Sequence, residues 1–162
     1  MSFRKKIKPY IFAPLSHQLV SDVWAEYNRP NDKINELVKS GELIALRRGL
    51  YVPGPELDLP IPEYFLIANH MRGPSYISME SALSYWGMIP ERVYTISSVT
   101  TRTTKVYETT LGRFSYQHLT TPFYALGITR VELSTQQFAL IASREKALCD
   151  TIIFTSRLIL RS

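Results

Sequence analysis

Between residues 29 and 48 the chain carries polar and basic side chains of the types that contact nucleic acids. Asparagine can bind the N6 and N7 atoms of adenine together, lysine can reach guanine or phosphate, and arginine can hold phosphates or enter a minor groove. The same charges would also suit an ordinary solvated helix face, so the elements that carry them decide between the two interpretations. The side chains that we predict to contact DNA are Arg29, Asn31, Lys33, Asn35, Lys39, Arg47 and Arg48.

The elements around these side chains predict the second half of a winged helix-turn-helix. A helix begins at Asn31 as N-cap, buries an apolar stripe and ends at Gly41. Two short strands then flank a turn at Arg47-Arg48-Gly49. Such a module presents Lys33, Asn35 and Lys39 to a DNA groove and the ribbon to the phosphates beside it.

Upstream, Ser16 is expected to cap a helix that runs to about Tyr27, and Pro30 separates it from the next helix. Residues 3–15 contain Pro9 and Pro14, so this segment is expected to be a strand or an extended arm. The arm is basic, and it either follows the DNA backbone or serves as a solubilising tail. Its charges are those of Arg4, Lys5, Lys6 and Lys8.

The charge distribution agrees with a nucleic-acid module joined to a second part. The 162 residues carry a net charge of +5, and residues 1–55 hold nine Lys and Arg against five Asp and Glu, whereas residues 56–162 hold ten against nine. The single cysteine, Cys149, excludes an internal disulfide, and its apolar helical surroundings predict a buried, inert thiol. Because neither a signal peptide nor a membrane span is found, we expect a cytoplasmic protein without a membrane partner.

Proline and glycine set the expected domain boundary. The segment 53–60 holds three prolines and a glycine, which sustain neither a helix nor a central strand. We therefore predict a DNA-binding domain at 1–53, a linker at 54–60 and a second domain at 61–162. The second domain mixes helices at 62–71, 79–86 and 144–154 with strands within 93–118 and at 138–142, so the fold class is α+β.

Two constellations in the second domain could carry catalysis, and in both a structural role is the preferred interpretation. Ser78 or Ser81 near Glu80 could supply a nucleophile, but no motif places a base beside them, and a capped helix explains the same residues. Glu145-Lys146 with Asp150 raises the possibility of a nuclease, yet neighbouring helical residues point about 100° apart. Three scattered histidines make no metal site. We expect no catalytic residues, no metal and no cofactor.

Blocks spread over nearly the whole chain resemble a known family. They include Leu37-Val38-Lys39-Ser40-Gly41-Glu42-Leu43-Ile44, Arg48-Gly49-Leu50-Tyr51-Val52, Gly73-Pro74-Ser75-Tyr76-Ile77-Ser78, Glu80-Ser81-Ala82-Leu83-Ser84-Tyr85, Gly87-Met88-Ile89-Pro90-Glu91 and Glu145-Lys146-Ala147-Leu148-Cys149-Asp150. In order and content these blocks resemble the short form of the AbiEi antitoxins of type IV toxin–antitoxin (abortive infection) systems.

The resemblance implies a transcriptional repressor that binds an inverted repeat in its own operator, with two copies as a homodimer on the DNA. It further implies an antitoxin that counteracts a nucleotidyltransferase toxin without forming a stable complex with it. Relatives of this form continue past the final helix, so the apolar end at Leu158-Ile159-Leu160-Arg161-Ser162 suggests C-terminal truncation. Two alternatives stay open: a nuclease-like enzyme in the second domain, and a module that binds protein or RNA.

Overall fold

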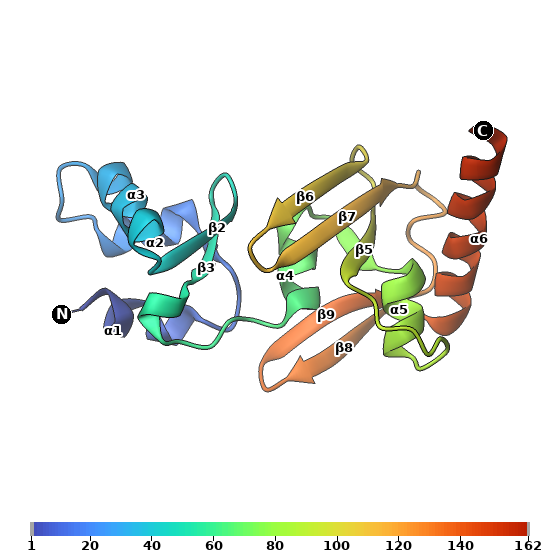
Figure 1. Cartoon of the computed structure of the whole chain (residues 1–162), viewed down its shortest axis with the longest axis horizontal. Helices are drawn as coiled ribbons and strands as arrows, with labels where there is room; N and C mark the ends of the chain where they lie inside the picture. The colour runs from blue at the N-terminus through green and yellow to red at the C-terminus, as the bar shows by residue number, and fades with distance from the viewer. Residues whose placement is uncertain (1, 162) are drawn as a thin grey trace. The chain divides into compact units, whose positions relative to one another are not determined.

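The computed structural model describes residues 2–161, with side chains through Arg157. The chain is of the α+β class and divides into two compact units, Met1–Glu63 and Tyr64–Ser162. The residues on which the expected truncation rests, 158–162, lie outside the part whose side chains are described. Each unit has its own sheet and helices, and each is described separately below (Figure 1).

The first unit combines three α-helices with a small antiparallel sheet. Its elements are α1 (Phe3–Ile7), β1 (Leu15–Ser16), α2 (His17–Val23), α3 (Pro30–Ser40), β2 (Leu43–Arg47) and β3 (Leu50–Pro53), with 3-10 turns at Lys8–Tyr10 and Pro55–Leu57. The strand order is β1-β3-β2. Side chains from all three helices and from both ends of the unit form one core: Phe3, Ile7, Leu15, Val20, Trp24, Ile34, Leu37, Leu43 and Leu57.

The prediction of a strand or an extended arm for residues 3–15 is wrong for the first residues of this segment, where α1 forms. Ser2 caps this helix, because its Oγ accepts a hydrogen bond from the Lys5 backbone N–H at 3.4 Å. Phe3 and Ile7 lie four residues apart on one face and are both buried. Burial of this apolar pair, rather than the surrounding charge, fixes the conformation of the segment.

The next two helices differ from expectation in their ends. Ser16 caps α2 as predicted, with its Oγ accepting from Leu19 N–H at 3.1 Å, but the helix ends at Val23 instead of Tyr27. The N-cap of α3 is Arg29 and not Asn31, because Pro30 occupies the first helical position that its fixed φ favours. At the other end Gly41 stops α3 in the left-handed conformation, with φ 84°, as predicted.

The segment 54–60, predicted as a linker, is packed against the first unit. Leu57 is 4% exposed and belongs to its core. The Gly54 N–H donates to Glu42 O at 2.8 Å, and Arg4 donates to the carbonyls of Leu57 and Asp58 at 3.0 and 3.1 Å. Prolines prevent regular helix or strand here but not packing, so the division between the units falls later, after Glu63.

The second unit is built on a six-stranded mixed sheet of order β6-β7-β5-β4-β9-β8, in which β5–β7 and β4–β9 are parallel pairs. Its elements are α4 (Tyr64–Met71), β4 (Ser75–Ile77), α5 (Met79–Tyr85), β5 (Thr95–Thr100), β6 (Lys105–Thr109), β7 (Gly112–His118), β8 (Ile128–Ser134), β9 (Gln137–Ala142) and α6 (Arg144–Arg161).

Helices cover both faces of this sheet (Figure 1). Tyr116 of β7 donates to Ala68 O of α4, whereas Tyr76 of β4 donates to Asp150 of α6. The register aligns Tyr76 with Val99 and Val99 with Gln117, so Tyr76 and Tyr116 point to opposite faces. Thus α4 lies on one face and α6 on the other.

Several details of the second unit were not anticipated. Strands β4 and β8 were missed, the first because it holds only three residues. Cys149 is exposed, which contradicts the expected buried thiol. The buried positions of α6 are Ala147, Asp150 and Phe154, and Cys149 lies on the other side of the helix.

Candidate functional site

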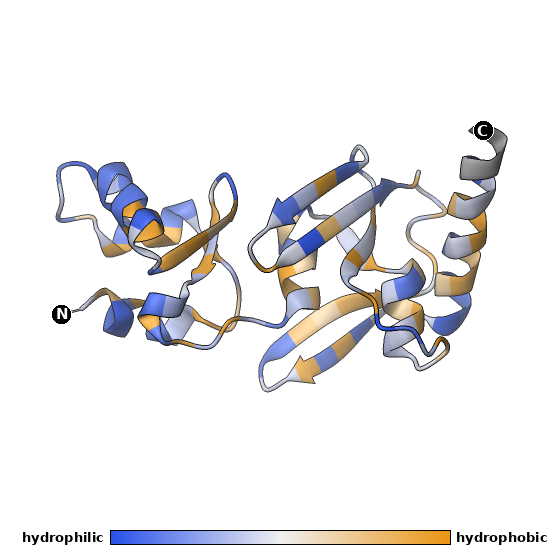
Figure 2. Cartoon of the chain, in the orientation of Figure 1, coloured by the Kyte–Doolittle hydropathy of each residue, from blue (hydrophilic) through white to orange (hydrophobic). Residues whose placement is uncertain are grey.

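Helix α3 presents two chemically different flanks to solvent. Ile34 and Leu37 are buried at 2% and 5% exposure, and this apolar stripe fixes the rotation of the helix against the core. Figure 2 shows that α3 is mostly hydrophilic with hydrophobic bands along it, and that the tip of the β2–β3 ribbon is hydrophilic. The predicted DNA-contacting side chains are divided between the two flanks.

One flank of α3 and the β2–β3 ribbon enclose a groove of about 570 Å³. Asn31, Asn35 and Arg48 line it, and they are three of the seven predicted residues. The other lining residues are His17, Ile34, Gly49 and Tyr51, so among the described residues no carboxylate lines this groove. The groove therefore offers hydrogen-bonding amides and a guanidinium with no carboxylate among the described residues that line it. This suits contact with the negatively charged backbone of a nucleic acid.

The opposite flank pairs each of its cations with a carboxylate. Arg29 lies 3.8 Å from Asp32, and Lys33 lies 3.4 Å from Glu36. The Lys33 ammonium also lies over the rings of Trp24 and Tyr27, at 5.2 and 5.5 Å from their centroids. Two positive and two negative charges give this flank no net charge, so Arg29 and Lys33 are placed less favourably for DNA than the groove residues.

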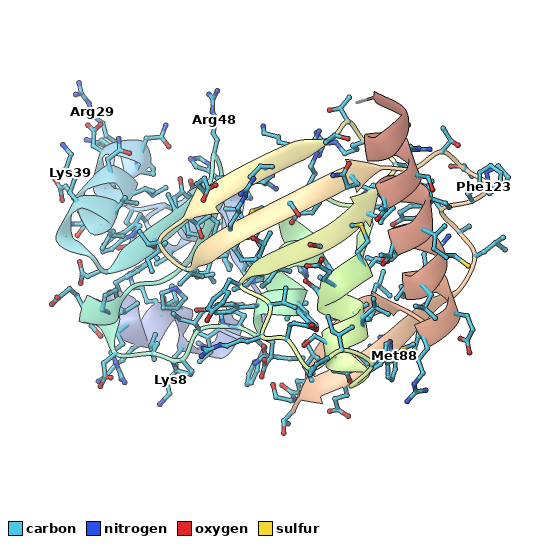
Figure 3. All side chains as sticks on the ribbon, turned by 45° about the vertical axis from the view of Figure 1, so that its right-hand side comes forward. Lys8, Arg29, Lys39, Arg48, Met88 and Phe123 are labelled. Atoms are coloured by element: carbon cyan, nitrogen blue, oxygen red, sulfur yellow. The ribbon has the colours of Figure 1, made fainter. Side chains whose placement is uncertain are left out.

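Arginines 47 and 48, at the ribbon turn, have different roles. The Nη1 of Arg47 donates to the backbone carbonyl of Arg48 at 2.7 Å, so this side chain folds back on the turn and is partly buried. Arg48 is exposed and extends away from the backbone (Figure 3). Lys39, one turn of α3 beyond Asn35, also extends into solvent (Figure 3).

The sequence interpretation missed His17 and Tyr51, which the tertiary structure brings into the groove. The backbone N–H of His17 donates to Gly49 O at 3.0 Å, which ties the start of α2 to the ribbon turn. The His17 side chain reaches α3, where its Nε2 lies 2.8 Å from Oδ1 of Asn31. For His17, the sequence offered one indication of a place in this site: a polar residue directly follows the Ser16 cap.

In the second unit, three of the residues considered for catalysis, Ser78, Lys146 and Asp150, belong to a buried polar network with Tyr76. Tyr76 OH and Ser78 Oγ donate to Oδ2 of Asp150 at 2.8 and 2.7 Å, and all three residues are 0% exposed. The Lys146 ammonium lies 3.5 Å from Oδ1 of the same carboxylate and donates to the carbonyl of Phe123. The network links β4, α6 and the 119–127 loop across the core.

The burial of this network gives Ser78 and Asp150 structural roles. Ser78 is enclosed and donates its hydroxyl hydrogen to a carboxylate, and Ser81 bonds to the backbone of β5 through Thr95 O and Ser97 N. Burial, and then the negative charge of Asp150, raise the pKa of Tyr76 well above its ordinary value. Glu145 is exposed on α6, separated from the buried Asp150.

A comparison with protein-family models and with curated proteins finds no match for this chain. Within residues 2–161, no helix is both long enough and apolar enough to cross a bilayer. The described side chains also contain no group of three His, Cys, Asp or Glu that could hold a metal ion.

Proposed function

We propose that the first unit is a winged helix-turn-helix that binds DNA, with α3 as the recognition helix and the β2–β3 ribbon as the wing. The element order α1-β1-α2-α3-β2-β3 and the strand order β1-β3-β2 support this proposal, since they match the arrangement of a winged helix. The observation that carries it is the groove between α3 and the ribbon, lined by Asn31, Asn35 and Arg48 without a described carboxylate.

In the proposed complex α3 enters the major groove with its wing-side flank toward the bases. Asn35 lies where it can contact a base edge, and Lys39 lies farther along the same flank for a phosphate or a guanine. Arg48, at the exposed tip of the wing, reaches phosphates or the adjacent minor groove. Arg29 and Lys33 contribute less, because Asp32 and Glu36 offset their charges.

The binding experiment is a selection of duplexes from a randomised pool, followed by affinity measurements between about 50 and 200 mM salt. A substitution that removes one phosphate contact should flatten the slope of log K against log salt by about 0.9. If the full chain enriches no duplex, or if the selected duplex binds without salt dependence, the proposal is wrong. Enrichment of RNA instead would favour the alternative of an RNA-binding module.

We further propose that DNA binding serves repression of the protein's own operon in the cytoplasm, together with an antitoxin role against a nucleotidyltransferase toxin. The support for this is the sequence resemblance to the AbiEi antitoxins described above. Co-expression with a nucleotidyltransferase encoded beside this gene tests it, with growth as the readout. Growth arrest that the full chain does not relieve would contradict the antitoxin role while leaving DNA binding intact.

A further inference from the structure

The side chain of Asn31 is held by a residue of the preceding helix. His17 Nε2 lies 2.8 Å from Asn31 Oδ1, and His17 Nδ1 lies 3.4 Å from the Ser21 hydroxyl. Both His17 and Asn31 line the groove between α3 and the wing. The contact therefore acts within the surface proposed for DNA.

The chemistry of this contact fixes the direction of the hydrogen bond. An amide oxygen has no hydrogen, so Nε2 of His17 must carry the hydrogen and donate it. In the neutral ring Nδ1 is then an acceptor, and the Ser21 hydroxyl is placed to donate to it. One tautomer of His17 thus satisfies both contacts, and it uses the Asn31 oxygen as the acceptor.

We infer that His17 is a positioning residue that holds the Asn31 amide oxygen toward α2, so that Asn31 contacts DNA through its N–H groups, an inference that rests on the proposed DNA binding. With one lone pair of Oδ1 taken by His17, Asn31 offers DNA chiefly the N–H groups of Nδ2. These suit acceptor atoms: a phosphate oxygen, or N7 and O6 of a purine. Bidentate binding of adenine also needs the amide oxygen to accept from the N6 amino group. Oδ1 of Asn31 would have to do so through its second lone pair while keeping the contact with His17, so we assign this mode to an asparagine whose amide is not restrained in this way.

Asn35 is the residue of this flank whose amide oxygen and amide nitrogen are both available to DNA. It lies one turn beyond Asn31, lines the same groove and is exposed. Among the described residues, neither its amide oxygen nor its amide nitrogen has a hydrogen-bond partner. The two asparagines of α3, similar in sequence, therefore have different roles, with adenine recognition assigned to Asn35.

The tautomer can be tested without DNA. The ¹⁵N chemical shifts and two-bond couplings of the His17 ring, measured on the full chain at a pH where the ring is neutral, distinguish Nε2–H from Nδ1–H. We expect the Nε2–H form in the wild type and a mixture of tautomers in Asn31→Ala. A wild-type ring in the Nδ1–H form overturns the inference.

The division between the asparagines can be tested on a duplex selected by the wild-type protein. Each adenine is replaced in turn by purine, which lacks the N6 amino group but keeps N7. At one position this should weaken wild-type binding about tenfold. This weakening should disappear in Asn35→Ala and persist in Asn31→Ala. A weakening that disappears in Asn31→Ala, or none at any adenine, overturns the inference.

Asn31→Ala itself separates the two kinds of acceptor. Equal weakening on every duplex indicates a phosphate oxygen, whereas weakening confined to duplexes with one particular guanine or purine position indicates a base edge. Both outcomes support a DNA contact through the Asn31 N–H groups, and unchanged affinity on all duplexes contradicts it.

The positioning role is tested with His17→Leu, which removes the donor, and His17→Gln, whose amide N–H can replace Nε2–H. We expect His17→Leu to weaken binding about threefold, because the Asn31 amide must then be ordered on binding, and His17→Gln to restore it. Gln18→Leu, an exposed change at the next position, is the matched control and should leave affinity unchanged. Binding by His17→Leu equal to that of wild type overturns the inference alone, whereas failure of the wild type to enrich any duplex removes the proposed function as well.

Discussion

The guanidinium of Arg47 donates a hydrogen bond to the backbone carbonyl of Arg48, 2.7 Å away, and so the two arginines of the wing have different surroundings. Arg47 is partly buried against its own turn, while Arg48 is exposed at the tip. A pair that looks equivalent in the sequence therefore consists of a residue that stabilises the turn and a residue free to reach a phosphate.

Arg48→Ala should weaken DNA binding and flatten the log–log salt slope by about 0.9, the value of one phosphate contact. Arg29→Ala is the matched control, because it removes the same charge from the flank where Asp32 lies 3.8 Å away. Fluorescence anisotropy with the selected duplex over a salt series measures both slopes. Equal flattening by the two variants would show that the DNA does not distinguish the flanks of α3.

Tyr76→Phe should destabilise the second unit by about 2 kcal/mol at neutral pH, because the buried Asp150 carboxylate loses one of its two hydroxyl donors. The measurement is urea unfolding followed by circular dichroism. Thr155→Ala, at an exposed position of α6, provides a control and should change stability little. A free energy of unfolding equal to that of wild type would contradict the proposed structural role of the network.

The same tyrosine predicts a dependence of stability on alkaline pH. Since burial and Asp150 raise the pKa of Tyr76 in the folded state, its contribution is fully present below the unfolded pKa of about 10 and is lost as pH rises above it. Between pH 10 and 11 the free energy of unfolding of wild type should therefore fall by about 1 kcal/mol more than that of Tyr76→Phe, since the unfolded tyrosine is about half ionised at pH 10. Parallel slopes for the two proteins would contradict the assignment.

Ile7→Ala should destabilise the first unit by about 2–4 kcal/mol and weaken DNA binding with it, because Ile7 is 0% exposed in the core. Lys5→Ala changes an exposed position of the same helix and should leave the free energy of unfolding within about 0.5 kcal/mol of wild type. Thermal unfolding of both variants distinguishes the packed helix from a basic tail. A tail would tolerate both substitutions equally.

Gly54→Ala should destabilise the first unit by more than about 3 kcal/mol, because a Cβ at this position would lie 2.0 Å from the carbonyl oxygen of Gly41. Gly87→Ala is the comparison in the second unit: its φ of +71° is strained for alanine, but the added Cβ meets no atom within 4 Å, so about 1 kcal/mol is expected. Chemical denaturation gives both values. A larger effect at Gly87 than at Gly54 would contradict the close packing of 54–57 on the first unit.

Local signals in the sequence determined many elements of this protein. Ser16 as a cap, Gly41 as a stop and the turn at Arg47-Arg48-Gly49 predicted α2, the end of α3 and the β2–β3 ribbon, and the structure confirms them. These features depend on backbone geometry and capping within a few residues, so they can be read from neighbouring positions alone.

The tertiary structure decided what those signals do not contain. Burial of Phe3 and Ile7 makes a helix of a segment that its prolines and charges indicated as an arm, and burial of Leu57 incorporates an apparent linker into the first unit. Packing of Ile34 and Leu37 sets the rotation of α3, which places Asn31 and Asn35 in the groove and pairs Lys33 with Glu36 on the other flank. His17 and Asn31 are 14 residues apart, and only the approach of α2 to α3 brings them into contact. Contacts of this kind depend on which surfaces are buried over the whole unit, and no single stretch of sequence specifies them.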